Sequence, residues 1–304
     1  MLSLEAHGQR VTVNPRGGGL ARYTLLGAAG PREVLLGYDR EDEYEGAMGD
    51  VLAPFPNRVR DSRYTDGATV REITGFSRKD GHSVHAFARE LPWKLETVGA
   101  AIHADLDVTA SSFAPRGYPY TLQLRLRYRL EPDGLMVEAR AENKGSNRAP
   151  FGLAFHPYLA LAGKIDDAVL TLSAGDLYKF NENLDGLAPV LPPARLGLDF
   201  THPKRIGDHV VNGCYGKLPR DHAGLAWITL EEPSHRRKAV VWQDGGFPFV
   251  QIYTGEVLVR NPRGGLAIEP STVTPFAFNG DGFGALWLES GESFAGAWGI
   301  RVIS

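Results

Sequence analysis

The sequence predicts an all-β protein built as a large antiparallel β-sandwich, and three observations support this prediction. Apolar and polar residues alternate with a period of two in several short segments, which is typical of half-buried strands. The chain contains 36 glycines and 20 prolines among its 304 residues, and these residues supply the turns that short strands require. No segment shows a sustained apolar stripe with the helical repeat of 3.6 residues, so strands separated by turns are the best interpretation.

The middle of the chain carries the clearest strand signal. Apolar residues occupy alternate positions over 122–130, with polar residues between them, so one face of this segment is apolar. Proline and glycine then stand at 131–134, where a tight turn needs them, and the alternation resumes over 135–141. We therefore predict an antiparallel hairpin here. Further short strands are expected at 11–13, 239–242 and 249–253.

Composition and charge narrow the class of protein. A net charge of −3 gives no reason to expect nucleic acid or an anionic membrane as a partner. The lone Cys214 cannot form an internal disulfide, the N-terminus lacks the features of a signal peptide, and no run approaches the roughly 18 apolar residues of a membrane span. We predict a single domain over residues 1–304, in the cytoplasm, as a monomer or homodimer.

Four short stretches carry more reactive side chains than packing requires. They are residues 53–59, 81–93, 155–158 and 267–270. Each has a simpler explanation, since Arg58 could be a surface arginine and His156 a packed histidine. Glu269 is more informative, because it lies between apolar residues and a proline. A carboxyl group in that position either faces outward or is held in a pocket, where it needs a partner or a raised pKa.

Other chemistries have weaker support in the sequence. His82 and His85 have the HxxH spacing that can serve a metal, but a zinc site needs three or four ligands, and no second cluster completes one. Ser83 lacks the G-x-S-x-G elbow of a nucleophile. Residues 279–282 begin like a calcium loop but lack its closing glutamate. We therefore expect no metal and no cofactor.

Several motifs occur in the order that they have in the aldose 1-epimerase family. They are N-R-V at 57–59, H-A-F-A-R-E-L-P-W at 85–93, G-Y-P-Y at 117–120, F-H-P-Y-L at 155–159, V-Q-I-Y-T at 250–254, E-P-S-T at 269–272, P-F-A-F-N at 275–279 and L-E-S-G-E-S-F at 288–294. The chain thus resembles an aldose 1-epimerase (galactose mutarotase) from about residue 10 to its C-terminus. This resemblance implies the large antiparallel sandwich of the galactose mutarotase-like fold and a small monosaccharide as substrate.

The resemblance also implies roles for individual residues. Glu269 matches the general base of the family and His156 its general acid. Arg58 matches the arginine that binds sugar hydroxyls, and His85 matches the histidine of an L-H-G motif, although its neighbours differ here. Asn57, expected mainly to hold its loop, and His82 complete the candidates around the sugar in this part of the chain.

One segment departs from the family pattern. Many members carry an aspartate in a D-x-x-F segment, whereas residues 212–215 begin with Asn212. An asparagine keeps one acceptor oxygen but replaces the other with a donor amide, so it cannot accept from two hydroxyls. Asn212 is still expected to bind the sugar, but a preference for galactose or glucose does not follow.

The activity implied is interconversion of the α and β anomers of a free aldose. A base takes the proton of the C1 hydroxyl, an acid protonates the ring oxygen, and the opened chain closes on its other face. We expect a carboxylate and an imidazolium at opposite edges of the pyranose, since histidine has an ordinary pKa of about 6.5.

Two alternatives remain open from the sequence. A hexose-phosphate mutarotase would need extra arginines or lysines around the pocket, and neither Arg89 nor Arg260 can be placed there from sequence. A non-catalytic sugar-binding protein on the same fold would not need a paired base and acid.

Overall fold

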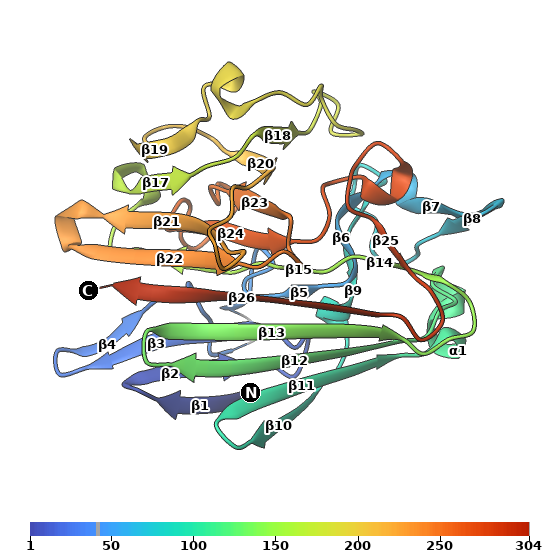
Figure 1. The fold of residues 1–304 in the computed structure, drawn as a ribbon, viewed down its shortest axis with the longest axis horizontal. Helices are drawn as coiled ribbons and strands as arrows, with labels where there is room; N and C mark the ends of the chain where they lie inside the picture. Colours follow the sequence, from blue (N-terminus) through green and yellow to red (C-terminus); the bar gives the residue numbers. More distant parts are fainter. Residues whose placement is uncertain (41–42, 304) are drawn as a thin grey trace.

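Antiparallel strands dominate the computed structural model, which describes residues 1–40 and 43–303. The largest sheet has nine strands in the order β10-β11-β12-β13-β26-β22-β21-β17-β19. Its long strands run side by side across Figure 1. The nine strands are β10 (Lys94–Val98), β11 (Ala101–Val108), β12 (Leu122–Glu131), β13 (Gly134–Asn143), β17 (Val169–Leu172), β19 (Phe200–Arg205), β21 (Ala226–Glu232), β22 (Arg237–Gln243) and β26 (Ser293–Ile303).

A second sheet of seven strands carries most of the candidate site residues. Its order is β18-β20-β23-β24-β15-β5, with β16 pairing to β24 beside β15. The strands are β5 (Val51–Leu52), β15 (Ala154–Phe155), β16 (Tyr158–Ala160), β18 (Asp176–Lys179), β20 (Asn212–Gly216), β23 (Phe249–Tyr253) and β24 (Gly265–Ser271).

Smaller sheets and short helical turns complete the described structure. A four-stranded sheet contains β1 (Leu2–Ala6), β2 (Gln9–Val13), β3 (Leu20–Gly27) and β4 (Gly30–Glu33). Three strand pairs join β6 (Pro54–Val59) to β9 (Ser83–Phe87), β7 (Arg63–Asp66) to β8 (Thr69–Glu72), and β14 (Ala149–Phe151) to β25 (Leu286–Leu288). The helical turns are α1 (Ala110–Phe113), η2 (Arg60–Ser62), η3 (Ala88–Glu90), η4 (Ala114–Arg116), η5 (Ile165–Asp167), η6 (Pro193–Leu196), η7 (Pro233–His235) and η8 (Ala277–Asn279).

The predicted fold class is confirmed, and the predicted hairpin is its clearest element. Strands β12 and β13 pair antiparallel from Leu122↔Asn143 to Glu131↔Gly134. The apolar positions of β12 are buried, as the period-two pattern indicates, and the polar positions between them are partly or fully exposed. The three further strands expected at 11–13, 239–242 and 249–253 lie within β2, β22 and β23.

One hydrophobic core joins the sheets. Its largest cluster combines buried side chains from the nine-stranded, seven-stranded and four-stranded sheets. Phe155 of the seven-stranded sheet packs on Trp298 of β26, with ring centroids 5.1 Å apart. The hydroxyl of Tyr128 on β12 donates to the backbone oxygen of Gly18, which ties the long sheet to the N-terminal strands.

Strand alternation decides which side chains of the seven-stranded sheet leave the core. Ile268 and Ile252 are opposite each other on β24 and β23, and both belong to the core cluster. Because successive side chains point to opposite faces of a strand, their neighbours Glu269 and Gln251 point away from that core. These two residues are also cross-strand partners, so they lie next to each other on the outer face.

Candidate active site

A polar cavity of about 760 Å³ is located on this outer face of the seven-stranded sheet. Several elements contribute to its wall: strands β6, β9, β20, β23 and β24, the segment around β16, and the turn before β9. The lining residues are Gly46, Ala47, Asn57, Arg58, Arg78, Lys79, Asp80, Val84, His85, Arg89, His156, Tyr158, Phe180, Asn212, Gln251, Tyr253, Val257 and Glu269. The sequence candidates Glu269, His156, Arg58, His85, Asn57 and Asn212 therefore come together from five separate parts of the chain.

Glu269 and His156 lie side by side in this cavity. His156 Nε2 is 3.5 Å from Glu269 Oε1, and the two side chains are only 6% and 5% exposed. The backbone around His156 is held on both sides, because its N–H donates to the oxygen of Asp50 and its C=O accepts from Gly49. Its ring stacks on Tyr158, with centroids 5.0 Å apart and planes inclined by 25°. These two backbone hydrogen bonds and the stacking on Tyr158 together orient the imidazole toward the carboxyl group.

Burial changes the proton affinity of both groups. It raises the pKa of Glu269 well above its usual value, because the charged carboxylate loses its hydration. Burial also lowers the pKa of His156 far below its usual value, and the positive charge of Arg89 adds to this effect. In the geometry of the structure, the neutral forms of both side chains are therefore favoured.

These observations correct two details of the sequence-based expectation. The acid and the base do not lie at opposite edges of a sugar-sized space, because they are in contact distance of each other. His156 is also not held as an imidazolium by its surroundings, because its burial disfavours the charged form. The ordinary pKa of histidine, used in the sequence argument, does not apply to a ring that is enclosed in this way.

His85 and Asn57 are coupled through the backbone. The N–H of Asn57 donates to His85 Nδ1 over 3.1 Å, so the neutral imidazole carries its proton on Nε2 and can donate from there. The His85 ring lies edge-on to that of His156, with centroids 5.6 Å apart. Both Asn57 and His85 have positive φ, of 57° and 56°, a backbone conformation that non-glycine residues adopt at a cost and that clusters at functional sites. The backbone N–H of Asn57 thus holds the His85 ring in place, and the role expected for the Asn57 side chain stays a prediction.

Arg58 lines the cavity but is already paired. Its Nη1 lies 2.5 Å from Asp80 Oδ2, and its guanidinium stacks over the ring of Phe180. The side chain is 20% exposed, so it can share its remaining donors with a bound molecule. The arginine fork has five donors, and one carboxylate cannot occupy them all.

Asn212 also reaches the cavity, from the first residue of β20. Its Oδ1 accepts from Gln251 Nε2 over 2.7 Å. This hydrogen bond uses the acceptor of Asn212 and leaves its amide N–H groups to donate. Gln251 in turn presents a buried Oε1 without a partner among the described residues.

The structure places His82 outside the cavity wall. Its side chain is 6% exposed, and its Nδ1 accepts from the backbone N–H of Asp61 over 3.0 Å. The ring packs edge-on against Phe276. The expectation that His82 contacts the sugar therefore has no support in its position, because the ring is buried between the Asp61 N–H and the ring of Phe276.

The hydrogen bonds of His82 and His85 are relevant to the metal site that their HxxH spacing could serve. Each histidine accepts a backbone hydrogen bond at Nδ1, from Asp61 and Asn57 respectively. Within residues 1–40 and 43–303, no three His, Cys, Asp or Glu side chains are grouped so that they could hold a metal ion.

Across the same part of the chain, no helix has the length and apolar character that crossing a bilayer requires.

Sequence reasoning missed several cavity residues. Gln251 and Tyr253 lie in a motif that was recognised, but only the pairing of β23 with β24 shows that they share the face of Glu269. Arg89 could not be placed from sequence, and the structure puts it in the cavity wall, with its Nε 2.8 Å from Asp50 Oδ2. Arg260 lies outside the wall and pairs with Glu45.

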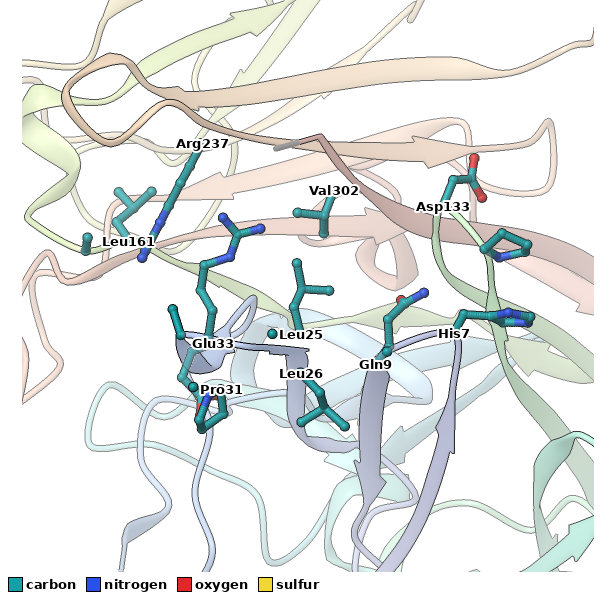
Figure 2. A pocket seen from close by; sticks show the side chains of 17 residues that line it. His7, Gln9, Leu25, Leu26, Pro31, Glu33, Asp133, Leu161, Arg237 and Val302 are labelled. Atoms are coloured by element: carbon teal, nitrogen blue, oxygen red, sulfur yellow. The ribbon is translucent and has the colours of Figure 1, made fainter.

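A second cavity, of about 770 Å³, lies between the four-stranded sheet and the ends of β13 and β26. Leu25 and Val302 point toward one another across it (Figure 2). Its two carboxylates, Glu33 and Asp133, form ion pairs with Arg22 and Arg301. The first cavity differs from this one because it contains a buried acid–base pair, which makes it the candidate active site.

Fold and site together define a β-sandwich protein with a polar cavity around a buried carboxyl–imidazole pair. The sequence matches the family described as aldose 1-epimerase over residues 1–300, and the chain belongs to this family. A curated relative, the uncharacterized protein YihR of Escherichia coli strain K12, is 28% identical over 295 residues, which cover 96% of this chain and 89% of YihR.

Solved structures agree with the fold. A homologue of galactose mutarotase and aldose epimerase from C. elegans superposes with a TM-score of 0.85 at 15% identity, over 99% of this chain and 98% of the other. A galactose 1-epimerase from Lactobacillus acidophilus superposes with a TM-score of 0.79 at 18% identity, over 99% and 93% of the two chains. These similarities establish a galactose mutarotase-like fold.

Proposed function

We propose that the protein is an aldose 1-epimerase that interconverts the α and β anomers of a monosaccharide, with Glu269 as general base and His156 as general acid. The observation that supports this most strongly is the buried pair itself, with Nε2 and Oε1 3.5 Å apart in a polar cavity. Membership of the aldose 1-epimerase family supports the same reaction class.

The short distance between the two groups fits the chemistry of a hemiacetal. The C1 hydroxyl oxygen and the ring oxygen are bonded to the same carbon atom, so the groups that serve them must lie close together. Glu269 accepts the proton of the C1 hydroxyl while His156 donates one to the ring oxygen. This breaks the bond between C1 and the ring oxygen and leaves an aldehyde at C1 and a hydroxyl at the former ring oxygen. Rotation about C1–C2 then presents the other face for closure.

The proton inventory of the pair follows from these steps. Ring opening ends with a protonated Glu269 and a neutral His156, which is the form that burial favours. Ring closure returns the proton of Glu269 to the C1 oxygen and moves that of the sugar hydroxyl to His156. A cyclic sugar stabilises the opposite, charge-separated form, because its C1 hydroxyl donates to the carboxylate and its ring oxygen accepts from the imidazolium. The pair therefore alternates between two protonation states during one turnover.

A non-catalytic sugar-binding role is less compatible with this site. Burying a carboxyl group and an imidazole in contact costs stability unless both are fully hydrogen-bonded, and sugar binding alone does not require such a pair. His156 Nδ1 is buried and has no hydrogen-bond partner among the described residues. A sugar could be bound by hydroxyl-binding groups alone.

Asn212 provides a test of the sugar-binding wall. In Asn212→Asp, one carboxylate oxygen can keep the bond from Gln251 and the other can accept from a sugar hydroxyl. We expect the ranking of kcat/KM among galactose, glucose, xylose, arabinose and fucose to shift by about 1–2 kcal/mol, while kcat on the best sugar is retained. Steady-state polarimetry of wild type and variant measures this. Unchanged ratios throughout the panel would show that Asn212 does not contact the sugar.

Metal removal provides a second test. The proposed steps transfer only protons, so activity should survive exhaustive dialysis against EDTA and should need no added nucleotide. Coupled assays before and after dialysis, with metal content measured in parallel, check this. Activity that is lost to EDTA and restored by zinc would return attention to His82 and His85.

The proposed function is tested directly by dissolving crystalline α anomers of neutral aldoses and following optical rotation. The protein should bring rotation to equilibrium faster than buffer does, in proportion to its concentration. A rate that never exceeds the spontaneous one, for neutral or charged sugars, would refute the proposal.

A further inference from the structure

A buried network of charged and polar side chains lies next to His156. Its members are Asp50, Arg89 and Tyr44. Arg89 Nε lies 2.8 Å from Asp50 Oδ2, and these two side chains are only 14% and 5% exposed. The hydroxyl of Tyr44 donates to Asp50 Oδ2 and accepts from Arg89 Nη2. The ion pair is therefore held in a fixed arrangement.

Asp50 is joined to the proposed acid through the backbone. Its C=O accepts from the N–H of His156 over 3.0 Å, and the C=O of His156 accepts from the N–H of Gly49 over 2.9 Å. The side chain of Asp50 holds Arg89, which lines the same cavity as His156. One residue thus anchors both the imidazole and a cation of the cavity wall.

The positive charge of Arg89 acts on His156. After burial, this charge is the next cause of the lowered pKa of the His156 imidazole, and it also helps to lower the pKa of His85. The proposed reaction nevertheless needs an imidazolium when the cyclic sugar is bound, since only a protonated His156 can give a proton to the ring oxygen. An Arg89 without a partner would therefore oppose ring opening.

The carboxylate of Asp50 offsets the charge of Arg89. Opposite charges that lie 2.8 Å apart act on more distant groups largely as a dipole, and their combined effect is weaker than that of a single charge. Among the residues that the structure describes, Asp50 forms the only ion pair of Arg89. The offset at His156 thus depends on this one carboxylate.

We propose that Asp50 is a positioning residue for the reaction, whose carboxylate holds and neutralises Arg89 so that His156 can carry the proton for the ring oxygen. This inference rests on the proposed function and deepens it. Asp50 is not among the residues that line the cavity, so it acts on the general acid through Arg89 and not by contact with the sugar.

The surroundings of Asp50 make this effect sensitive to pH. Burial raises the pKa of Asp50 to about 6, while the charge of Arg89 and the hydrogen bond from Tyr44 act against the rise. Asp50 is thus charged and offsets Arg89 above about pH 6, and it is neutral and without this effect below that pH. The charged and titratable groups that face it across a small neighbouring cavity are Arg16, Tyr38, Tyr44, Arg89 and Glu90.

The test measures kcat and KM by equilibrium NMR exchange over about two pH units on each side of the Asp50 pKa. Asparagine in Asp50→Asn keeps the size of the side chain but not its charge. We expect kcat to fall roughly tenfold at about pH 8, which corresponds to a shift of one unit in the pKa of His156, with little change in KM. The ratio of wild type to variant should approach one below about pH 6, because wild-type Asp50 is then neutral too.

A double variant separates the effect of charge from that of packing. Asp50→Asn leaves a buried guanidinium without its partner, which costs stability, so Tm is measured for each variant. Asp50→Asn/Arg89→Gln removes both charges, and its kcat at about pH 8 should exceed that of Asp50→Asn roughly tenfold. The change in KM reports separately on any contact between Arg89 and the sugar.

Tyr44→Phe is the matched control, because it removes a hydrogen bond from the same carboxylate without changing a charge. Its kcat at about pH 8 should differ from that of wild type far less than the kcat of Asp50→Asn does. The hydrogen bond from Tyr44 favours the charged form of Asp50, so the decline of kcat in acid should begin at a higher pH in this variant than in wild type.

Three results overturn the inference while the proposed function stands. They are an Asp50→Asn variant with wild-type kcat at neutral pH, a loss in that variant that is the same at every pH, and a double variant no faster than Asp50→Asn. Should Asp50→Asn not fold, the double variant decides, since a pH profile with the same shape as that of wild type would reject a role for Asp50. A wild type that accelerates no aldose overturns the proposed function, and this inference with it.

Discussion

Replacing Glu269 by glutamine should lower kcat for anomer interconversion by at least about 100-fold, the minimum expected for a general base. Glutamine keeps the shape of the side chain, but its amide cannot accept the C1 proton at neutral pH. Equilibrium NMR exchange with the best aldose measures the loss. Retention of more than about a tenth of wild-type kcat would show that Glu269 is not the base.

Stability provides the control for this variant. Burial raises the pKa of Glu269 in the folded protein above its value in the unfolded chain, so the folded state holds this proton more tightly. The contribution of this proton to the free energy of unfolding is fully present below the unfolded pKa of about 4.3. It declines as the pH rises from there toward the folded pKa. Glu269→Gln lacks this decline. Its Tm should equal or exceed that of wild type at about pH 7, with a smaller difference at about pH 4.

Replacing His156 by asparagine should also lower kcat, by roughly 10²- to 10⁴-fold, with a much smaller change in KM. The imidazole donates to the ring oxygen as its bond to C1 breaks, so its contribution is made mainly in the transition state. Asparagine retains polarity but cannot transfer a proton. Measuring kcat and KM separately distinguishes this from a loss of binding.

His85 offers the matched control for that experiment. Its Nδ1 is used by Asn57, so its Nε2–H is expected to bind a sugar oxygen without transferring its proton. His85→Asn should mainly raise KM. The assignment would be reversed by a His156 variant that keeps full turnover together with a His85 variant that loses it.

The fold was predictable because its signals are local. The alternation over 122–141 depends only on residues near one another in the chain, and β12 and β13 pair as it indicates. The order of the sheet was not predictable, because β13 pairs with β26, more than a hundred residues further along. The prediction of a single domain stays a prediction.

The site was predictable only in part. The motifs contained Glu269 and His156, but their contact depends on β24 lying between β15 and β23. The lowered pKa of His156 could not be predicted for the same reason, since burial is a property of the assembled sheets and not of a motif. Arg78 and Lys79 belonged to no recognised motif, and only the turn at 78–82 brings them to the cavity.

The central claim is that a buried carboxyl–imidazole pair exchanges the anomers of a sugar by proton transfer. Its most direct test is NMR magnetisation transfer between the α and β C1 protons at equilibrium, across neutral and charged aldoses. The account predicts exchange above the spontaneous rate for wild type and its near-complete loss in both Glu269→Gln and His156→Asn, with sugar binding retained. Exchange that stays at the spontaneous rate in wild type, or that survives in both variants, would contradict it.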